Sequence, residues 1–476
     1  MAKEEGITVK KDENFSEWYT QVILKSGFID YTDVSGCIVF RENCYAIWEN
    51  IQKEVDRRLK KIEIRNVYFP LFIPENLLKK EAEHVKGFAP EVAWVTHAGN
   101  TKLDERLAVR PTSETIMYSS YSKWIRSWRD LPLRLNQWNS VVRWEFKHPV
   151  PLLRTREFLW NEGHTVFATK KEAEAEMRTI MKLWETFCND FLALPNLPGQ
   201  KSEKEKFAGA EYTWSLEFVL SNGKAIQGPD AHYDGQNFAK AFNIKFLDKD
   251  EKKQYVFQNT WAITSRMIGI MLAIHGDDKG LVLPPKIALN KVVIVPILFK
   301  KDKEKVLKVA KEINKKLKKY DVILDDREDY SVGWKYNEWE LKGVPVRVEV
   351  GPNDVKKKQV VLVRRDTSEK KFVKIKDVDK EVKKILEDIQ ESLFLEAKKH
   401  LENSIVKVKS ISELKKVVNF RKIGKVNWCG AKKCEENIKH KTSAKSLNSE
   451  FDAKVKGKCF ACETEAKYST YFGKSY

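Results

Sequence analysis

The chain has 476 residues, of which 42% are hydrophobic and 33% charged, and its formal net charge is +19. A chain of this length exceeds a single hydrophobic core, so we expect about two to four domains. No apolar run approaches the roughly 18 residues of a membrane-spanning helix and the charged N-terminus lacks a signal core, which excludes a membrane protein and predicts a cytoplasmic one.

The first 280 residues have the periodicities of mixed helices and strands. Apolar residues recur at helical spacing over 43–60, and the strand that follows ends at Pro74. The run Pro111-Thr-Ser-Glu114 has the composition of a helix start, with Thr112 as its N-cap. The other elements expected here are a helix over 171–191, strands over 211–220 and 224–227, and an apolar segment over 261–274.

The segment 143–164 is predicted to form a hairpin with charges at alternate positions around a proline-rich loop. Because alternate residues of a strand share a face, Arg143 and Glu145 would point together, as would Arg154 and Arg156 on the facing strand. Guanidinium groups beside a carboxylate suit a nucleotide triphosphate, since arginine pairs with phosphate through directional hydrogen bonds. A solvated hairpin is the alternative for this segment taken alone.

A second domain is predicted after the linker Leu283-Pro-Pro-Lys286. Just before it, the apolar segment 261–274 contains one charge, Arg266, and a lone arginine in such a segment is either paired or used on a ligand. Beyond the linker, a strand over 291–296, an apolar helical stripe and a further strand form the start of a βαβ unit. We therefore expect a small α/β domain here.

The positive charge is concentrated in the C-terminal part of the chain. Residues 1–280 contain 40 Lys+Arg and 39 Asp+Glu, whereas residues 281–476 contain 47 and 29. The positive electrostatic field of such a region favours the binding of a polyanion, most often nucleic acid. A generally lysine-rich composition is the alternative, but it would not leave the N-terminal part neutral.

Four cysteines form two close pairs near the C-terminus. Cys429 and Cys434 are separated by four residues, and Cys459 and Cys462 by two. In a reducing compartment, this spacing predicts a tetrahedral zinc site that is structural, because four thiolates leave no open position for chemistry. Buried neutral thiols are the alternative, but the flanking lysines make the segment too polar for it.

Several motifs, taken in order, resemble prolyl-tRNA synthetases of the archaeal and eukaryotic-like type over almost the whole chain. The motifs are Arg110-Pro-Thr-Ser-Glu-Thr115, the 143–164 segment, Ala225-Ile-Gln227-Gly, His232, Gly235-Gln-Asn-Phe238, Thr264-Ser-Arg266, His275-Gly-Asp-Asp-Lys-Gly-Leu-Val-Leu-Pro-Pro285 and the terminal Tyr-Phe-Gly-Lys-Ser-Tyr476.

The resemblance implies an α+β chain of three domains. These are a class II antiparallel-sheet catalytic domain at 1–285, an α/β anticodon-binding domain at 286–403 and a small zinc-binding α/β domain at 404–476. It also implies a homodimer, with the segment around Pro70 at the interface. The implied reaction is ATP-dependent activation of L-proline to prolyl-adenylate, then transfer to the 3′ end of tRNA(Pro) with release of AMP and pyrophosphate. Mg²⁺ is expected with the ATP.

The resemblance also assigns the site residues. Arg143 and Arg266 would be the catalytic residues. The ATP site would consist of Arg143, Glu145, Arg154, Thr155, Gln227, Asp230, Thr264 and Arg266, with Gln227 also contacting Mg²⁺. The proline site would consist of Thr112, Glu114, Arg143, Phe88, Phe158, Trp160 and His232. Glu340 and Arg347 match positions that read anticodon guanines, although a structural salt bridge between them is the alternative. Tyr476 matches a C-terminus that folds back toward the active site.

Two positions depart from the family pattern. Asp230 lies in Pro229-Asp-Ala231, where relatives usually carry a Gly-Thr-Ser-like run, so it either binds metal or points away. Ala262 replaces a usual glycine and leaves less room for backbone approach to adenine. Two alternatives remain: a class II synthetase for threonine, serine or glycine, and a non-enzymatic RNA-binding paralogue. The second should have lost its phosphate-binding arginines, which this chain retains.

Overall fold

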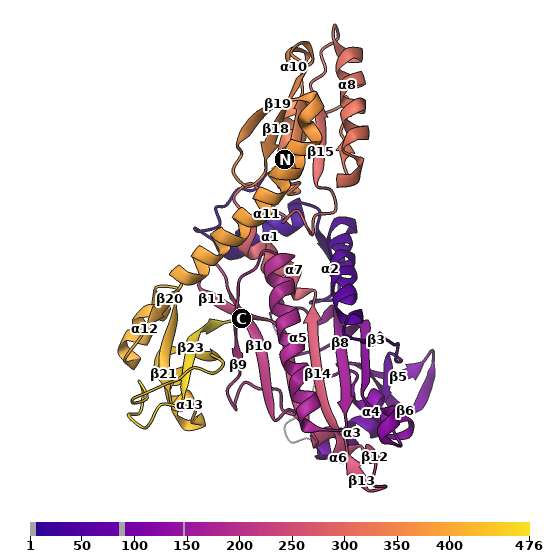
Figure 1. Ribbon diagram of the computed structural model, residues 1–476, viewed down its shortest axis with the longest axis vertical. Helices are drawn as coiled ribbons and strands as arrows, with labels where there is room; N and C mark the ends of the chain where they lie inside the picture. The colour runs from indigo at the N-terminus through magenta and orange to yellow at the C-terminus, as the bar shows by residue number, and fades with distance from the viewer. Residues whose placement is uncertain (1–5, 85–90, 146–147) are drawn as a thin grey trace.

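One large, mostly antiparallel sheet organises the lower part of the molecule (Figure 1). The computed structural model describes residues 6–84, 91–145 and 148–476, so Phe88 lies outside the described residues. In order across the sheet, its strands are β20 (Ile405–Lys407), β21 (Ile423–Trp428), β23 (Tyr468–Ser475), β22 (Lys445–Ser449), β9 (Leu197–Gln200), β10 (Tyr212–Val219), β11 (Lys224–Gly235), β14 (Phe257–Thr264), β8 (Glu157–Phe167), β7 (Leu133–Val142) and β3 (Arg65–Asn66).

The strands from β10 to β7 pair antiparallel with their neighbours, as predicted for the catalytic domain. The apolar faces of three helices, α2 (Glu42–Lys60), α5 (Lys170–Asp190) and α7 (Arg266–His275), bury the main core with α1 (Phe15–Lys25). Within this core, Trp184 and Trp261 pack edge to face at 6.0 Å. The core therefore fixes the sheet face that holds the site.

Smaller elements surround the sheet. They are the hairpins β1 (Ile29–Tyr31) with β2 (Ile38–Phe40) and β12 (Lys245–Leu247) with β13 (Lys253–Tyr255), the sheet of β4 (Phe72–Pro74), β6 (Thr101–Val109) and β5 (Trp94–Ala98), and the helices α3 (Glu75–His84), α4 (Glu114–Trp124), α6 (Asn237–Ala241) and η1 (Trp128–Asp130). Of the strand predicted over 67–74, only β4 is formed, and the short strand β3 precedes this range.

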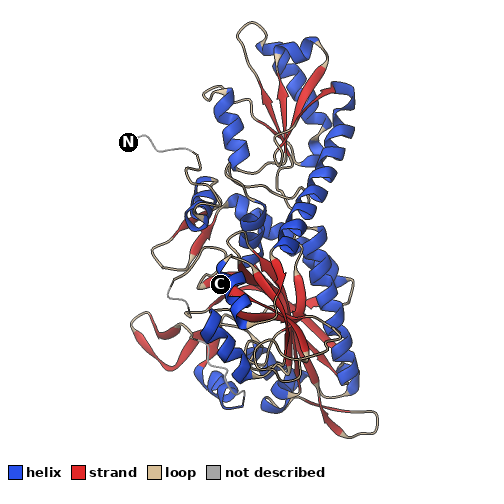
Figure 2. Ribbon diagram, turned by 90° about the vertical axis from the view of Figure 1, so that its left-hand side faces the viewer, coloured by secondary structure: helices blue, strands red, loops and turns tan. Residues whose placement is uncertain are grey.

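A separate five-stranded sheet stands at the other end of the molecule (Figure 2). Its order is β16 (Ile323–Leu324), β15 (Val292–Pro296), β17 (Val346–Val350), β18 (Gln359–Arg364) and β19 (Lys370–Lys374). β15 pairs parallel with β16 and β17, which confirms the predicted βαβ unit. The helices of this part are α8 (Lys303–Lys316), η2 (Lys318–Tyr320), α9 (Val332–Leu341), α10 (Pro352–Lys356) and η3 (Ile375–Asp377).

The C-terminal segment returns to the catalytic sheet instead of forming a sheet of its own. The long helix α11 (Val378–Asn403) leads down from the second sheet to β20 (Figure 1). After it come α12 (Ile411–Asn419) and α13 (Lys432–Thr442), and the last strand, β23, pairs parallel with the start of β11. The sequence did not predict this shared sheet.

Two local predictions are wrong. β7 ends at Val142 and β8 begins at Glu157, so the described residues between them, 143–145 and 148–156, belong to neither strand. The Arg143 N–H still donates to the Arg156 carbonyl at 2.8 Å, but the predicted alternation of charges along two facing strands is not formed. Prolines in this stretch cannot donate to a ladder, and Leu152 has a positive φ of 61°. The N-cap of α4 is Ser113, whereas the Thr112 hydroxyl donates to the Glu114 carboxylate.

Candidate active site

A cavity of about 430 Å³ lies against the face of the large sheet. Its walls come from β8, β11 and β14, from the loop between β7 and β8, and from the N-terminal ends of α4 and α7. The predicted site residues that line it are Thr112, Glu114, Arg143, Glu145, Thr155, Phe158, Trp160, Gln227, Asp230, His232, Thr264 and Arg266. Residues from distant parts of the sequence thus share one cavity.

Arg154 is the predicted ATP residue that does not line the cavity. Its side chain is exposed in the loop after Leu153. Its positive charge nevertheless contributes to lowering the pKa of Arg266, after the larger effects of burial and of Arg143. A role for Arg154 at the outer phosphates remains a prediction.

Arg143 enters the cavity from the loop that follows β7. Its Nε donates to the Pro111 carbonyl at 2.9 Å. Its guanidinium lies 5.5 Å from the Phe158 ring centroid and 5.2 Å from that of Trp160. Backbone and aromatic contacts therefore orient the group, and no carboxylate of the described residues forms an ion pair with it.

Arg266 enters from the opposite side, as the first residue of α7. Its Nε donates to the Leu153 carbonyl at 2.9 Å and its Nη1 to the Gln227 carbonyl at 3.1 Å. Burial lowers the pKa of Arg266, although the charge of Asp230 opposes this. Among the described residues, neither Arg266 nor Arg143 forms an ion pair, so both positive charges are available to an anionic ligand.

Asp230 points into the cavity. Gln227 Nε2 donates to its Oδ2 at 2.7 Å, and its Oδ1 lies 3.5 Å from His232 Nε2. The other ring nitrogen of His232 lies 2.9 Å from the Thr213 hydroxyl. Burial lowers the pKa of His232 despite the nearby carboxylates of Asp230 and Glu114, so this imidazole is neutral near pH 7.

A buried ion pair, Glu162 with His164, lies beneath the predicted proline site. His164 Nε2 lies 3.1 Å from Glu162 Oε2. Burial by itself would raise the pKa of Glu162, but the hydrogen bond and charge of His164 and donation by Ser113 and Asn139 lower it to about 2. The pKa of His164 is raised, because the Glu162 hydrogen bond and the charges of Glu114 and Glu162 outweigh burial.

This pair holds the cavity wall together. Glu162 accepts from the Ser113 backbone N–H at 2.9 Å and from Asn139 Nδ2 at 2.7 Å, while Trp160 Nε1 donates to Asn139 Oδ1 at 2.6 Å. The N-terminus of α4 and the Trp160 indole are thereby fixed to one carboxylate. The sequence assigned no role to Glu162 or His164, although their alternation with Phe158 and Trp160 along β8 could have shown that all four share a face.

Phe207 was also missed. It lines the cavity and packs on His232, with ring centroids 4.9 Å apart. It lies in the loop between β9 and β10, which has no periodicity that sequence reasoning could use.

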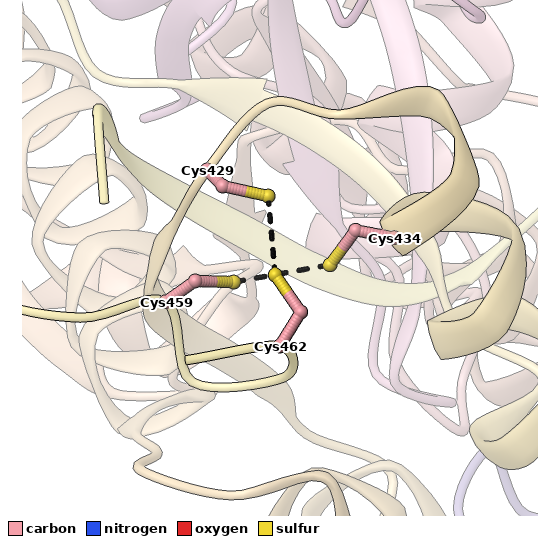
Figure 3. Close-up of side chains that lie close together, drawn as sticks. All are labelled: Cys429, Cys434, Cys459 and Cys462. Carbon is pink, nitrogen blue, oxygen red and sulfur yellow. Dashed lines mark hydrogen bonds between the residues drawn. The ribbon is translucent and has the colours of Figure 1, made fainter. Parts of the chain in front are cut away.

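The four C-terminal cysteines converge (Figure 3). The Sγ atoms of Cys429 and Cys462 lie 3.6 Å apart and those of Cys434 and Cys459 lie 3.8 Å apart. Tetrahedral zinc with Zn–S bonds of about 2.3 Å requires sulfurs about 3.8 Å apart. The four thiols therefore fit a structural zinc ion.

Glu340 and Arg347 lie outside the cavity, in the part of the molecule formed by the five-stranded sheet and its helices, here called the second sheet region. Arg347 Nη1 donates to Glu340 Oε1 at 3.0 Å, and its Nε and Nη2 donate to Glu349 Oε1 at 3.1 and 3.0 Å. The salt bridge weighed as an alternative is thus formed, and an anticodon role remains a prediction. The C-terminus lies close to the cavity, as the resemblance implied. The Tyr476 backbone N–H donates to the carbonyl of Ala225 at 3.1 Å, and Ala225 is two residues from Gln227.

The sequence matches three families in the same order as these structural parts. Residues 94–275 match the tRNA synthetase class II core domain (G, H, P, S and T), and residues 291–385 match the anticodon binding domain. Residues 411–476 match the prolyl-tRNA synthetase C-terminal family. The fold and the cavity are those of a class II aminoacyl-tRNA ligase.

Full-length relatives show to which family within this class the chain belongs. The chain is 47% identical to proline–tRNA ligase 2 of Bacillus thuringiensis (strain Al Hakam), over 100% of both chains. It is 50% identical to proline–tRNA ligase of Lachnoclostridium phytofermentans, over 99% of this chain and 98% of that one. The chain belongs to the prolyl-tRNA synthetase family, which sets aside both the synthetases for other amino acids and a non-enzymatic paralogue.

Solved structures agree with this assignment. Prolyl-tRNA synthetase from Cryptosporidium parvum complexed with halofuginone and AMPPNP matches with a TM-score of 0.94 at 45% identity, over 100% of this chain and 98% of that one. The same enzyme complexed with L-proline and AMP matches with a TM-score of 0.94 at 44% identity. Across the described residues of this chain, no helix combines the length and apolar character needed to cross a membrane.

Proposed function

We propose that this chain activates L-proline with ATP in the cavity and transfers it to the 3′ end of tRNA(Pro). The observation that carries the proposal is the pair of arginines, Arg143 and Arg266, which face one cavity without an ion-pair partner among the described residues. A triphosphate would neutralise both. The C. parvum enzyme, with 45% identity, is described as a complex with AMPPNP, which supports ATP as the ligand.

Proline would lie at the α4 end of the cavity. Its secondary ammonium group needs an anionic partner, and Glu114 with Thr112 provides a carboxylate and a hydroxyl at the start of α4. Its ring of methylenes needs apolar walls, which Phe158, Trp160 and the neutral His232 ring supply. The Glu162 and His164 pair would hold this end rigid by fixing Trp160 through Asn139.

Adenylation would require positioning and charge neutralisation more than covalent catalysis. The proline carboxylate attacks the α-phosphorus of ATP, a new bond to this carboxylate oxygen forms, and the bond to pyrophosphate breaks. Arg143 would hold the α-phosphate and the attacking carboxylate together, while Arg266 and Thr264 would hold the far side of the nucleotide. Glu145 would accept from the adenine amino group, with Thr155 beside it, and Arg154 would reach the outer phosphates from the loop.

Oxygen atoms of Gln227 and Asp230 are of the type that Mg²⁺ prefers. Bound there with ATP, Mg²⁺ would screen the repulsion between the anionic nucleophile and the triphosphate. Asp230 would thus take over a place usually held by a hydroxyl residue. Its hydrogen bond from Gln227 and its position inside the cavity support this over a carboxylate that points away.

Proline-dependent exchange of pyrophosphate into ATP, measured with a panel of amino acids, tests the proposed reaction. We expect exchange with proline and none with threonine, serine or glycine. Exchange with threonine and none with proline would contradict the assignment.

The partner tRNA would be read at a distance from the cavity. The excess positive charge of residues 281–476 supports nucleic-acid binding there, and Glu340 with Arg347 would read anticodon guanines, since arginine pairs with guanine through two hydrogen bonds. We also propose the division into domains at 1–285, 286–403 and 404–476 and a cytoplasmic location.

A homodimer would form around the segment near Pro70. Large apolar side chains are exposed there, with Tyr68 at 72% and Phe72 at 44%. A second copy that covered them would remove this apolar surface from water. Light scattering on the purified protein tests this, and a monomer at micromolar concentration would contradict it.

The zinc ion would be structural. Four thiolates would hold it and link the start of α13 to the loop before β23. We expect about one zinc per chain by metal analysis, and expect a chelator to expose residues 429–467 to proteolysis while the rest of the chain stays resistant. Full resistance after zinc removal would contradict a structural role.

A further inference from the structure

A single buried arginine, Arg365, joins the catalytic part to the second sheet region. It lies in the turn after β18, and its side chain is 2% exposed. Its Nη1 and Nη2 each donate to a carboxylate oxygen of Asp277 at 2.7 Å. Its Nε donates to the carbonyl of Glu340, also at 2.7 Å. One guanidinium is therefore shared between the two parts of the molecule.

Both partners of Arg365 lie at the C-terminal ends of helices. Asp277 is two residues beyond the end of α7, and Glu340 is the next-to-last residue of α9. The C-terminal end of a helix has unsatisfied carbonyls and a negative partial charge. A cation between two such ends stabilises both, and the negative charge of Asp277 adds to this. Burial raises the pKa of Asp277, but the Arg365 hydrogen bonds and charge outweigh it.

A backbone hydrogen bond also joins the catalytic part to the second sheet region, at the junction formed by Arg365. The Leu281 N–H donates to the Leu341 carbonyl at 3.0 Å, and Lys279 Nζ lies 3.7 Å from the Glu340 carboxylate. On the catalytic side, Lys11 Nζ donates to the last carbonyls around the end of α7, those of Ile274 and Gly276, at 3.0 and 2.7 Å. The end of α7 is thus fixed from both sides.

The N-terminal end of α7 lies at the cavity. Its first residue is Arg266, and the residues from Met267 to Ala273 are all buried. A buried helix of ten residues, about 15 Å long, moves as one body because its close-packed sides leave no room to bend. A displacement at Asp277 would therefore be carried to Arg266.

The far side of the junction reaches the predicted anticodon pair. The residue whose carbonyl binds Arg365 is Glu340, and its own carboxylate accepts from Arg347. A guanine that competes for Arg347 or Glu340 would change the charge balance at the end of α9. The route from this pair to the cavity is therefore continuous: Glu340, Arg365, Asp277, α7 and Arg266.

We propose that Arg365 is a positioning residue that couples occupancy of the anticodon pair to the placement of Arg266 in the cavity. The fork on Asp277 suits this role, because two parallel charge-assisted hydrogen bonds fix orientation as well as distance. This inference rests on the proposed function, since it assumes that a tRNA anticodon is read at Glu340 and Arg347. Arg365 does not line the cavity, and it does not contact the carboxylates of Glu340 or Glu349. We therefore expect a substitution of Arg365 to change the kcat of aminoacylation and not the affinity for tRNA.

Matched variants separate this role from a general loss of charge. Arg365→Gln removes the fork on Asp277. Arg364→Gln removes the neighbouring arginine, which forks Asp366 at 3.0 and 2.6 Å and donates to the Ser392 hydroxyl of α11 at 3.2 Å, away from Asp277. Asp277→Asn weakens the same fork from the catalytic side, and it serves if Arg365→Gln fails to fold.

The experiment compares two transcripts with each protein. One is tRNA(Pro), and the other is the same transcript with both anticodon guanines replaced by adenines. In the parent protein and in Arg364→Gln, we expect the altered anticodon to lower the kcat of aminoacylation by about fivefold or more, the usual lower range of a coupling between sites. In Arg365→Gln and Asp277→Asn, this kcat ratio should approach one, while the change in KM persists.

Proline-dependent pyrophosphate exchange without tRNA serves as the internal reference. Its presence in the parent protein establishes the activity, and its retention in Arg365→Gln shows that the variant is folded. A kcat ratio in Arg365→Gln equal to that of the parent would overturn the coupling, as would an anticodon effect that appears in KM alone in the parent. Absence of proline-dependent exchange in the parent would instead overturn the proposed function.

Discussion

The arginines of the cavity and those of the second sheet region are held in opposite ways. Arg143 and Arg266 donate to backbone carbonyls. Arg347, Arg364 and Arg365 each fork or bridge carboxylates. The first arrangement orients a guanidinium that has no ion-pair partner among the described residues, although the charge of Asp230 acts on Arg266, whereas the second pairs the guanidinium with a carboxylate.

This difference separates two uses of arginine. A partly buried guanidinium without an ion-pair partner is costly unless an anion arrives, so its position indicates where phosphate binds. A guanidinium paired with a carboxylate offers geometry more than charge, which suits discrimination between bases or a joint between domains. Substitutions in the two regions should therefore have different effects.

Removal of an arginine without an ion-pair partner should have the largest effect. Arg143→Ala should lower proline-dependent pyrophosphate exchange by about a thousandfold, because charge that develops in the transition state loses a preorganised partner. Arg156→Ala is the matched control in the same loop, since Arg156 donates to the Ser35 carbonyl and does not line the cavity. Equal rates of exchange for Arg143→Ala and the parent would contradict the role of Arg143.

The buried pair under the cavity should contribute to stability in a pH-dependent way. The pKa of Glu162 is lowered from 4.5 to about 2, so its contribution is present above pH 4.5 and is lost as the pH falls toward 2. The shift corresponds to about 3 kcal/mol of unfolding free energy. Glu162→Gln should therefore be less stable than the parent at neutral pH, and the difference should shrink on acidification.

Denaturant titrations over this pH range provide the measurement. The raised pKa of His164 adds stability that is present below pH 6.5 and lost as the pH rises through its folded-state value, and Glu162→Gln should weaken this too. Glu174→Gln is the control, because Glu174 forms an exposed pair with Lys170 on α5. A pH-independent difference between Glu162→Gln and the parent would argue against the ion pair.

Removal of an arginine paired with a carboxylate should have a smaller and more selective effect. Arg347→Ala should leave proline-dependent exchange unchanged and lower kcat/KM for tRNA(Pro) by about tenfold to a hundredfold, the value of one bidentate base contact. Aminoacylation kinetics with the two transcripts described above provide the measurement. If Arg347→Ala lost exchange to the same degree as Arg143→Ala, the two regions would not differ as we infer.

The sequence predicted the parts of this structure that depend on local pattern. Helical spacing located α2 and α5, a strand-like segment before a turn located β10, an apolar run located β15, and paired cysteines located the thiol cluster. The family motifs predicted that Arg143, Asp230 and Arg266 share one site. The register of the strands could not be predicted from the sequence: Ala262 of β14 pairs with Asp230 on one side and with Glu162 on the other.

The remaining features depend on long-range packing. No periodicity shows that β23 adds to the edge of β11, because that pairing joins residues 224–225 to 474–475. The charge pattern that follows β7 looks strand-like, but prolines cannot donate to a ladder, and the described residues 148–156 lie outside the strands. Arg365 resembles its neighbour Arg364 in sequence, and only the fold assigns one to the junction and the other to a local fork.

Calorimetric titration of a non-hydrolysable ATP analogue into the parent, Arg266→Ala and Arg347→Ala tests most directly whether the guanidiniums without an ion-pair partner bind the nucleotide. We expect binding to the parent and to Arg347→Ala with similar affinity, and loss of binding in Arg266→Ala. Unchanged affinity in Arg266→Ala would contradict the account.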